Sequence, residues 1–144
     1  MIDVADKEVT ERTARARAVI RLSEETLQRI QEGRIPKGDV LAVARVAGIQ
    51  AAKDTARFLP LCHPIPLEGV EIDFAFHTRP SGIEIETSSR ATWKTGVEME
   101  ALTAAAAAAL TIYDMCKSIE RGISIESIEL LEKRGGRTGT WVRD

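Results

Sequence analysis

The chain has 144 residues, of which 44% are hydrophobic and 29% are charged, and its formal net charge at pH 7 is −2. This length is typical of one compact domain, and the composition is too apolar for a disordered chain. The small net charge excludes a global attraction to nucleic acid or to an anionic membrane. Because no linker or internal repeat is visible, residues 1–144 are predicted to form a single domain.

Cysteine and histidine are both scarce. The two cysteines, Cys62 and Cys116, are too few for a disulfide framework. No apolar stretch typical of a secretory leader follows Met1, and the longest run of low polarity, Ala101–Thr111, is too short to span a bilayer. We therefore expect a cytoplasmic protein with free thiols and no membrane association. With only two histidines, a structural zinc site is not expected.

The first predicted elements are a strand and a short helix. From about Ala14 to Leu22, small or apolar residues alternate with arginines and one valine, which predicts a strand with one wet, basic face. Ser23 suits the N-cap of a helix, acidic residues follow in its first turn, and Gly33 ends it.

A second helix and a stiff loop follow. Asp39 suits an N-cap, apolar residues recur at helical spacing after it, and Pro60 stops the helix. The segment Pro60–Pro66 contains three prolines, which restrict their own φ angles and push the preceding residues to extended geometry. This loop presents His63 in a restricted orientation.

The second half of the chain predicts a hairpin and a long helix. Alternation over Val70–Phe76 and again over Ile83–Glu86, separated by an Arg-Pro-Ser-Gly turn, indicates two paired strands. Thr95 and Glu98 fit a capping box that opens a helix reaching about Ile119.

A last strand over Ile123–Leu130, followed by the glycine-rich segment Lys133–Gly139, completes the order β-α-α-β-β-α-β. Hairpins and helices in this order imply a largely antiparallel sheet with helices on one face. We therefore predict an α+β, ferredoxin-like sandwich with one additional helix. Its edge strands favour self-association, because an uncovered edge is a pairing site.

Asp114 and Lys117 are the first candidates for chemistry. They lie three residues apart, so they share one helix face. They follow an alanine-rich stretch with no other charge after Glu100, and a lone acid and base near the end of a buried helix are candidates for shifted pKa values. A lysine beside an anionic substrate can donate a proton while the aspartate orients it. The alternative is an ordinary solvated ion pair.

His63 and Lys37 are candidates whose sequence context is less specific. A rigid loop suits an acid–base group, yet a packed loop histidine is the alternative for His63. Lys37 precedes a helix N-terminus, where free N–H groups and the helix dipole attract anions, and a simple surface lysine is the alternative. No Walker-type glycine pattern is present, so the segment is not a P-loop.

Two glutamates at the start of the long helix pose a geometric problem. Glu98 and Glu100 are two residues apart and should face different directions unless the turn is non-helical there. From Glu100 to Asp114 the helix rises roughly 21 Å, at about 1.5 Å per residue. Groups this far apart cannot both reach one reacting centre within one chain. If both act, the site joins two subunits and the protein is an obligate oligomer.

Six segments together resemble the MoaC family, and the likeness covers essentially the whole chain. They are Met1–Val4, Lys37–Val40, Pro60–Pro64, Lys94–Thr103, Tyr113–Lys117 and Lys133–Gly136. The resemblance implies that the substrate is a cyclised GTP derivative, 3′,8-cyclo-7,8-dihydro-GTP, and that the products are cyclic pyranopterin monophosphate and pyrophosphate. It also implies a ferredoxin-like fold and a hexamer, a trimer of dimers, with sites at the dimer interface.

The resemblance marks two sets of residues by their positions. The essential polar set is Lys37, His63, Asp114 and Lys117. The substrate-contacting set is Leu61, Cys62, His63, Met99 and Glu100, with Glu98, Arg12 and Lys133 as further pocket positions. Trp93 departs from the small residue common in the family, which leaves the role of Lys94 open.

The implied reaction consists of proton transfers, ring opening and closure, and attack of a ribose oxygen on the α-phosphate. Lys117 is expected to be the principal acid or base. No redox cofactor is expected, and any Mg²⁺ would accompany the substrate phosphates. Two rival functions are an RNA-binding sheet, against which the 4% of aromatic residues argues, and a non-catalytic guanine-nucleotide-binding regulatory module. Turnover of the cyclised GTP derivative separates the enzyme from the regulatory module.

Overall fold

A computed structural model describes the whole chain, from Met1 to Asp144. It contains five strands and four helices. In chain order these are β1 (Thr10–Arg21), α1 (Glu24–Gln31), α2 (Val40–Lys53), α3 (Thr55–Phe58), β2 (Gly69–Thr78), β3 (Ser81–Trp93), α4 (Glu98–Cys116), β4 (Ser124–Arg134) and β5 (Trp141–Val142). None of the helices combines the length and the apolar character needed to cross a membrane.

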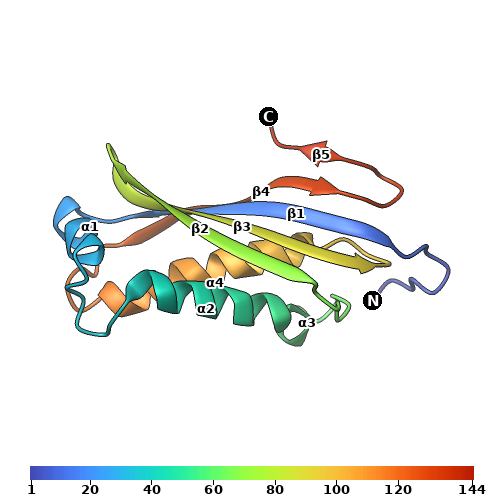
Figure 1. Ribbon diagram of the computed structural model, residues 1–144, viewed down its shortest axis with the longest axis horizontal. Coiled ribbons are helices and arrows are strands. Elements are labelled where there is room, and N and C mark those ends of the chain that lie inside the picture. Colours follow the sequence, from blue (N-terminus) through green and yellow to red (C-terminus); the bar gives the residue numbers. More distant parts are fainter.

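The five strands form one antiparallel sheet in the order β2-β3-β1-β4-β5. The first four strands have the arrangement of a ferredoxin-like fold, and the short β5 extends the sheet beside β4. α2 and α4 run along one face of the sheet, and α1 lies at one end of it (Figure 1). The predicted α+β sandwich with helices on one face is confirmed.

β1 lies at the centre of the sheet and shows the predicted alternation of faces. Its inward side chains, from Ala14 to Ile20, are small or aliphatic and fully buried. Its outward arginines pair with glutamates of the neighbouring strands: Arg15 with Glu86 and Glu132, Arg17 with Glu129, and Arg21 with Glu126. These glutamates neutralise the predicted basic face. The sheet therefore lacks the uncompensated positive charge that attracts RNA.

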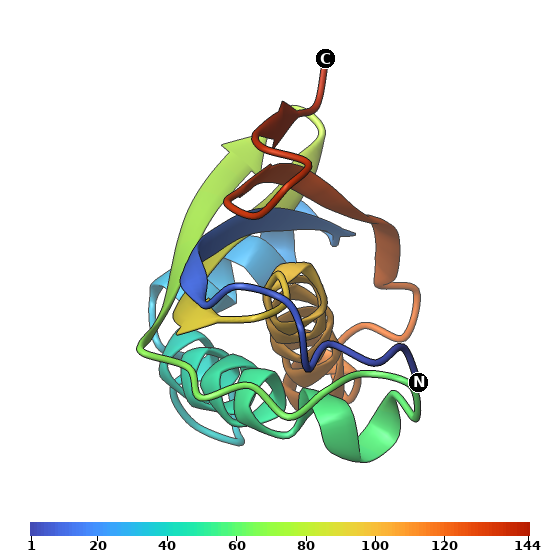
Figure 2. The ribbon, with the colours of Figure 1, turned by 90° about the vertical axis from the view of Figure 1, so that its right-hand side faces the viewer.

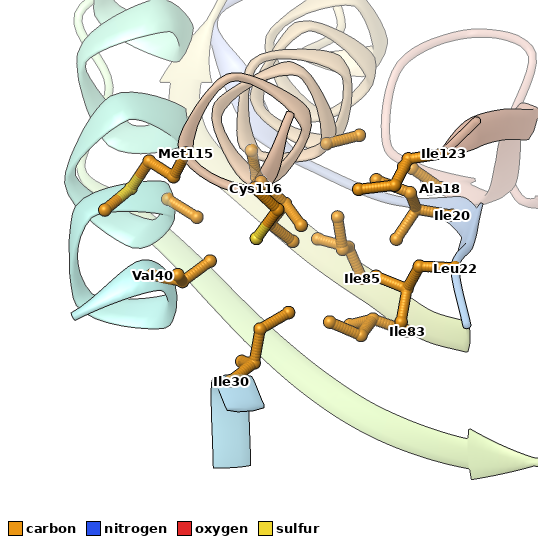
Figure 3. Close-up of a cluster of buried hydrophobic side chains, with 14 of the residues drawn as sticks. Ala18, Ile20, Leu22, Ile30, Val40, Ile83, Ile85, Met115, Cys116 and Ile123 are labelled. Atoms are coloured by element: carbon orange, nitrogen blue, oxygen red, sulfur yellow. The ribbon is translucent and has the colours of Figure 1, made fainter. Parts of the chain in front are cut away.

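α4 can pack closely in the core because the middle of its buried face is mostly alanine. Ala101, Ala104, Ala105, Ala108 and Ala109 are all fully buried. Larger side chains fill the core near the C-terminal end of α4, where Ile20, Ile83 and Ile85 gather with Cys116 and their neighbours (Figure 3). The alanine run of the sequence thus serves close packing.

α2 lies beside α4 under the sheet (Figure 2). The two helices approach each other at Gly48, where an added Cβ would lie 3.0 Å from the carbonyl oxygen of Ala104 and would overlap the side chain of Ile72. Glycine therefore lets the two helices approach this closely, because even a methyl group here would displace Ile72 and crowd the backbone of α4.

The structure confirms two predicted helix caps and corrects a third. The side chains of Ser23 and Asp39 accept hydrogen bonds from the amides of Thr26 and Ala42, and they cap α1 and α2. The capping box predicted at Thr95 is wrong. α4 begins at Glu98, so this residue is its first helical position, and the N-cap has no side-chain hydrogen bond to the helix.

Several element ends also differ from the predictions. The helix expected to reach Pro60 is interrupted at Asp54, which separates α2 from α3. α4 ends at Cys116, before the predicted end near Ile119. β3 is longer than predicted, because its inward positions include the buried polar residues Thr87 and Ser89, which hide the apolar alternation. β4 extends beyond its predicted end to Arg134, and the two-residue β5 was not predicted.

Candidate active site

The C-terminal end of α4 carries an ionic cluster of three residues. Asp114 Oδ1 accepts a hydrogen bond from Lys117 Nζ at 2.7 Å, and Asp114 Oδ2 accepts one from Lys37 Nζ at 2.8 Å. Lys37 Nζ also donates to the main-chain oxygen of Asp114 at 3.2 Å. Lys37 reaches this point from the turn that precedes α2. The fold thus brings together three predicted site residues from two distant segments.

Charge pairing determines the protonation of this cluster. Hydrogen bonds from Lys117 and then Lys37 lower the pKa of Asp114 to about 2, and the bond to Asp114 raises the pKa of Lys117. The predicted pKa shifts therefore occur. Their cause is pairing and not burial, because about half of each side chain is exposed. At neutral pH the carboxyl of Asp114 is ionised and Lys117 carries its proton.

A concavity of about 340 Å³ lies at the opposite end of α4, between the first turn of the helix and the Pro60–Pro66 loop. Its lining contains the substrate-contacting residues expected from the family resemblance: Leu61, Cys62, His63, Met99, Glu100 and Glu98. The loop has neither helix nor strand, as its three prolines predict. We call this concavity the carboxylate pocket.

The carboxylate pocket contains both glutamates of the first turn of α4, although they are two residues apart. Glu98 is the first helical residue, and its carboxylate folds back over Gly96, where a Cβ would overlap it. Because the Glu98 side chain folds back, both carboxyls can line one pocket even though the two residues lie in a regular helical turn. A side chain at position 96 would displace the Glu98 carboxylate from this place.

Burial and charge shift the pKa values in the carboxylate pocket. Glu100 is only 4% exposed, and burial, with a smaller contribution from the charge of Glu98, raises its pKa to about 7. Burial and the charge of Glu100 raise the pKa of the Cys62 thiol. Near neutral pH the pocket therefore holds a carboxyl that can either donate or accept a proton, next to a thiol that stays protonated.

A second concavity, of about 280 Å³, lies where β1 begins and is entirely polar. Its lining is Lys7, Glu8, Thr10, Arg12, Gly136, Arg137 and Thr138. The guanidinium of Arg12 donates to Thr10 Oγ1 at 2.7 Å and to the main-chain oxygen of Lys94 at 3.3 Å. Lys133 lies beside this lining through its contact with Thr138. We call this concavity the basic pocket.

A third concavity, of about 270 Å³, joins the other two. It shares Lys7 with the basic pocket, and it shares Leu61, His63 and Thr95 with the carboxylate pocket. The three concavities are therefore neighbours, with cations in the first, His63 in the third and two carboxyls in the carboxylate pocket, and we call them together the trough. Lys7 and Arg137 were not predicted, because they come from opposite ends of the chain and no local pattern marks them.

The trough and the Asp114 cluster do not meet within one chain. The carboxylate pocket is at the first turn of α4 and the Asp114 cluster at its last turn. The rise from Glu100 to Asp114 remains roughly 21 Å. His63 therefore does not contact Lys117 in a single copy. The predicted site residues form two separate half-sites.

Besides Met99 in the carboxylate pocket, three large apolar side chains are left exposed on the two helices that cover the sheet. They are Val43 and Val46 of α2 and Leu110 of α4. Neighbouring exposed apolar groups on a helical face are typical of an interface. No group of three or more His, Cys, Asp or Glu side chains is placed to hold a metal ion.

Comparison with known proteins gives a consistent set of relatives. The model of the MoaC family matches residues 1–136. The cyclic pyranopterin monophosphate synthase of Thermomicrobium roseum is 57% identical over 144 residues, which are 100% of this chain and 87% of that protein. The proteins of the same name from Novosphingobium aromaticivorans and Chloroflexus aurantiacus are 54% and 53% identical, over 98% and 99% of this chain and 88% of each relative.

Proposed function

Because the chain belongs to the MoaC family, we propose that it is a cyclic pyranopterin monophosphate synthase, a lyase of molybdenum cofactor biosynthesis. It converts 3′,8-cyclo-7,8-dihydro-GTP to cyclic pyranopterin monophosphate and pyrophosphate. The observation that carries this proposal is the identity of 53–57%, over nearly the whole chain, to proteins of that name. The enzyme acts in the cytoplasm, as the free thiols of Cys62 and Cys116 favour.

The trough suits a purine-derived triphosphate. Arg12 and Lys133, at the cationic end, neutralise the phosphates and the leaving pyrophosphate. At the other end, the Glu98 and Glu100 carboxyls accept hydrogen bonds from N–H groups of the guanine-derived ring. Leu61, Cys62 and Met99 complete the lining around this ring. The ring and the phosphates are thus held at opposite ends, with the ribose between them.

The proton transfers need groups of different acidity. Lys117 is the principal general acid or base, and Asp114 holds its charge and orientation. His63, in the middle of the trough, relays a second proton near neutral pH. Lys37 stabilises the phosphate charge beside Lys117. The bond changes involve no oxidation or reduction, so the scheme uses no redox cofactor, and Mg²⁺ carried by the substrate phosphates is compatible with it.

The complete site joins two copies of the chain, because one copy keeps its half-sites at opposite ends of α4. The trough of one copy faces the Asp114 cluster of a second copy, so that each dimer contains two sites. The exposed Val43, Val46 and Leu110 supply apolar area for such an interface. Three dimers assemble into the hexamer that the family resemblance implies.

Replacing Lys117 with Ala tests the function. We expect the wild-type protein to convert the cyclised GTP derivative, and Lys117→Ala to lose turnover by about a thousandfold or more. The side chain is half exposed, so its fold and oligomeric state should persist. Product formation by liquid chromatography and the oligomer mass measure both.

Lys53→Ala is the charge-matched control, since Lys53 is exposed at the end of α2 and is expected to leave the rate unchanged. A folded Lys117→Ala protein with the normal rate would remove Lys117 from the chemistry. A wild-type protein that binds the substrate without turnover would instead indicate the regulatory module.

A further inference from the structure

The first nine residues form neither helix nor strand, yet they line the trough. Met1, Ile2, Val4 and Lys7 line the concavity that contains His63. We propose that Met1–Val9, here called the N-terminal strap, is a wall of the substrate site that Lys94 fastens in place, and that Lys7 on the strap binds the polyphosphate. Lys94 is thus a positioning residue and Lys7 a binding residue. This inference rests on the proposed function for the identity of the substrate.

Lys94 makes the single hydrogen bond that joins the strap to the rest of the chain. Its Nζ donates to the main-chain oxygen of Ala5 at 2.9 Å. Within the strap, the amide of Ala5 donates to Asp3 Oδ1 at 2.8 Å and the amide of Lys7 to Val4 O at 3.1 Å. These bonds fold the strap on itself without attaching it. Its position over the trough therefore depends on Lys94 and on the half-buried Val4.

The sheet register places Lys94 at this point. Trp93, the last residue of β3, pairs with Thr10, the first residue of β1. Lys94 therefore leaves the sheet directly beside the place where the strap enters it, at the end of the sheet where Figure 1 shows the N-terminus. Trp93 itself lies in regular register with β1, and the contacts of Lys94 suggest the role that the sequence left open.

Lys94 also helps to hold the cationic end of the trough. Its main-chain oxygen accepts a hydrogen bond from the Arg12 guanidinium at 3.3 Å, while its side chain holds the strap that carries Lys7. Gly135 and Gly136 adopt positive φ angles of 97° and 78°, and a Cβ on either would crowd the Arg12 side chain. The backbone of Gly135 and Gly136 thus packs against Arg12, and Lys7 is supplied by the strap.

The chemistry of the basic pocket favours a polyphosphate ligand. Lys7, Arg12 and Arg137 line it with a single carboxylate, Glu8, and no hydrophobic residue. Several cations around one concavity bind multivalent anions more strongly than single charges do. Lys7 also lines the concavity with His63, so its ammonium lies between the phosphates and the reacting part of the substrate.

Binding of inorganic pyrophosphate by calorimetry, together with the Michaelis constants for the cyclised GTP derivative, tests the strap. We expect Lys7→Ala and Lys94→Met each to weaken pyrophosphate binding and to raise KM by about tenfold, with kcat nearly unchanged. The double variant should be no worse than either single variant, because both remove the same phosphate contact. Trypsin should cleave after Lys7 several-fold faster in Lys94→Met, because the strap is released.

Two matched variants complete the test. Lys94→Arg restores a donor to Ala5 and should recover binding, whereas Arg29→Ala on α1 removes one positive charge far from the trough and should change nothing. Wild-type pyrophosphate affinity in Lys94→Met, or losses that multiply in the double variant, would overturn the proposal.

The binding measurement is independent of turnover. A wild-type protein without turnover whose pyrophosphate binding still depends on Lys7 and Lys94 would contradict the proposed function alone. A protein with normal turnover and no such dependence would contradict the strap alone.

Discussion

Glu100 shows how one buried carboxyl links stability to function. It is almost fully buried at the start of α4, and burial raises its pKa from 4.5 to about 7. A carboxyl with a higher pKa in the folded than in the unfolded chain binds its proton more tightly in the folded state. The buried carboxyl therefore lowers the free energy of unfolding, but only at pH values at which the carboxyl of the unfolded chain is ionised.

This linkage predicts a pH-dependent effect of Glu100→Gln. Relative to the wild type, the variant should gain stability as the pH rises from about 4.5 to about 7. In this range the wild-type carboxyl is protonated in the folded chain and ionised in the unfolded chain, so the wild type alone loses stability. The gain should level off above pH 7 at no more than about 3 kcal/mol. Urea unfolding at pH 5 and pH 8, at equal protein concentration, measures it. A difference between the two proteins that is the same at both pH values would contradict the raised pKa.

The Asp114 cluster has the opposite character, because its pKa shifts come from pairing in solvent. Asp114 stays ionised at any pH above about 3. An anionic substrate that replaces Asp114 as the partner of Lys117 would therefore meet a lysine that already carries its proton. In a single copy these three side chains form an ordinary surface ion cluster, so the role that we propose for them requires a second copy to cover them.

At the level of elements, the contact of α2 with α4 constrains how the two helices pack. A Cβ at position 48 would lie 3.0 Å from the main-chain oxygen of Ala104 on α4, which is tighter than an ordinary contact, and would overlap the side chain of Ile72. Alanine favours helix over glycine by about 1 kcal/mol, so two effects of opposite sign compete at this position. The nearest backbone atom cannot rotate away, and the buried Ile72 side chain has little space to move.

Gly48→Ala should therefore destabilise the protein, by about 1–2 kcal/mol after the gain in helix propensity is subtracted from the cost of overpacking. Chemical denaturation with circular dichroism measures the change. Gln50→Ala, at an exposed position of the same helix, is the control and should stay within about 0.5 kcal/mol of the wild type. Greater stability of Gly48→Ala would mean that the helices separate easily.

The elements that were predicted correctly are those with local causes. The alternation in β1 and the caps Ser23 and Asp39 each depend on a few neighbouring residues. The start of α4 was not predicted, because the side chain of Glu98 turns toward Gly96 instead of completing a capping box. The length of β3 was missed because Thr87 donates a hydrogen bond to Ala101 O and is buried without being apolar.

In the candidate site, too, local features were predictable from the sequence and tertiary contacts were not. The separation of Glu100 from Asp114 was predictable, because a helix has a fixed rise. The contact of Lys37 with Asp114 and the arrival of Lys7 beside Arg137 depend on the tertiary fold, which brings together segments with no common pattern. The resemblance to a family marked most of the lining residues, but it gave no geometry for the strap or for Lys94.

At the level of the whole molecule, the two half-sites on one chain predict complementation. His63→Ala and Lys117→Ala should each be inactive. In a mixed dimer, one site combines both defects and the other combines two intact halves. Random mixing in equal amounts should therefore restore about one quarter of the wild-type activity, because half of the dimers are mixed and half of their sites are intact.

Coexpression of the two variants with different tags, followed by the turnover assay, measures this recovery. Lys117→Ala mixed with Asp114→Ala is the matched control, since both changes lie in the same half-site and no mixed site is intact. Recovery in the control, or none in the first mixture, would contradict a site shared between copies.

The uninterrupted helix between the half-sites acts as a rigid spacer. α4 has 19 residues without a break, and buried side chains fix it in the core from Glu100 to Cys116. Each added or deleted residue would turn one end by about 100° relative to the other and shift it by about 1.5 Å. In the proposed dimer, the Asp114 cluster would then point away from the facing trough, even with every side chain retained. In that assembly the length of the helix matters as much to the chemistry as the residues at its two ends.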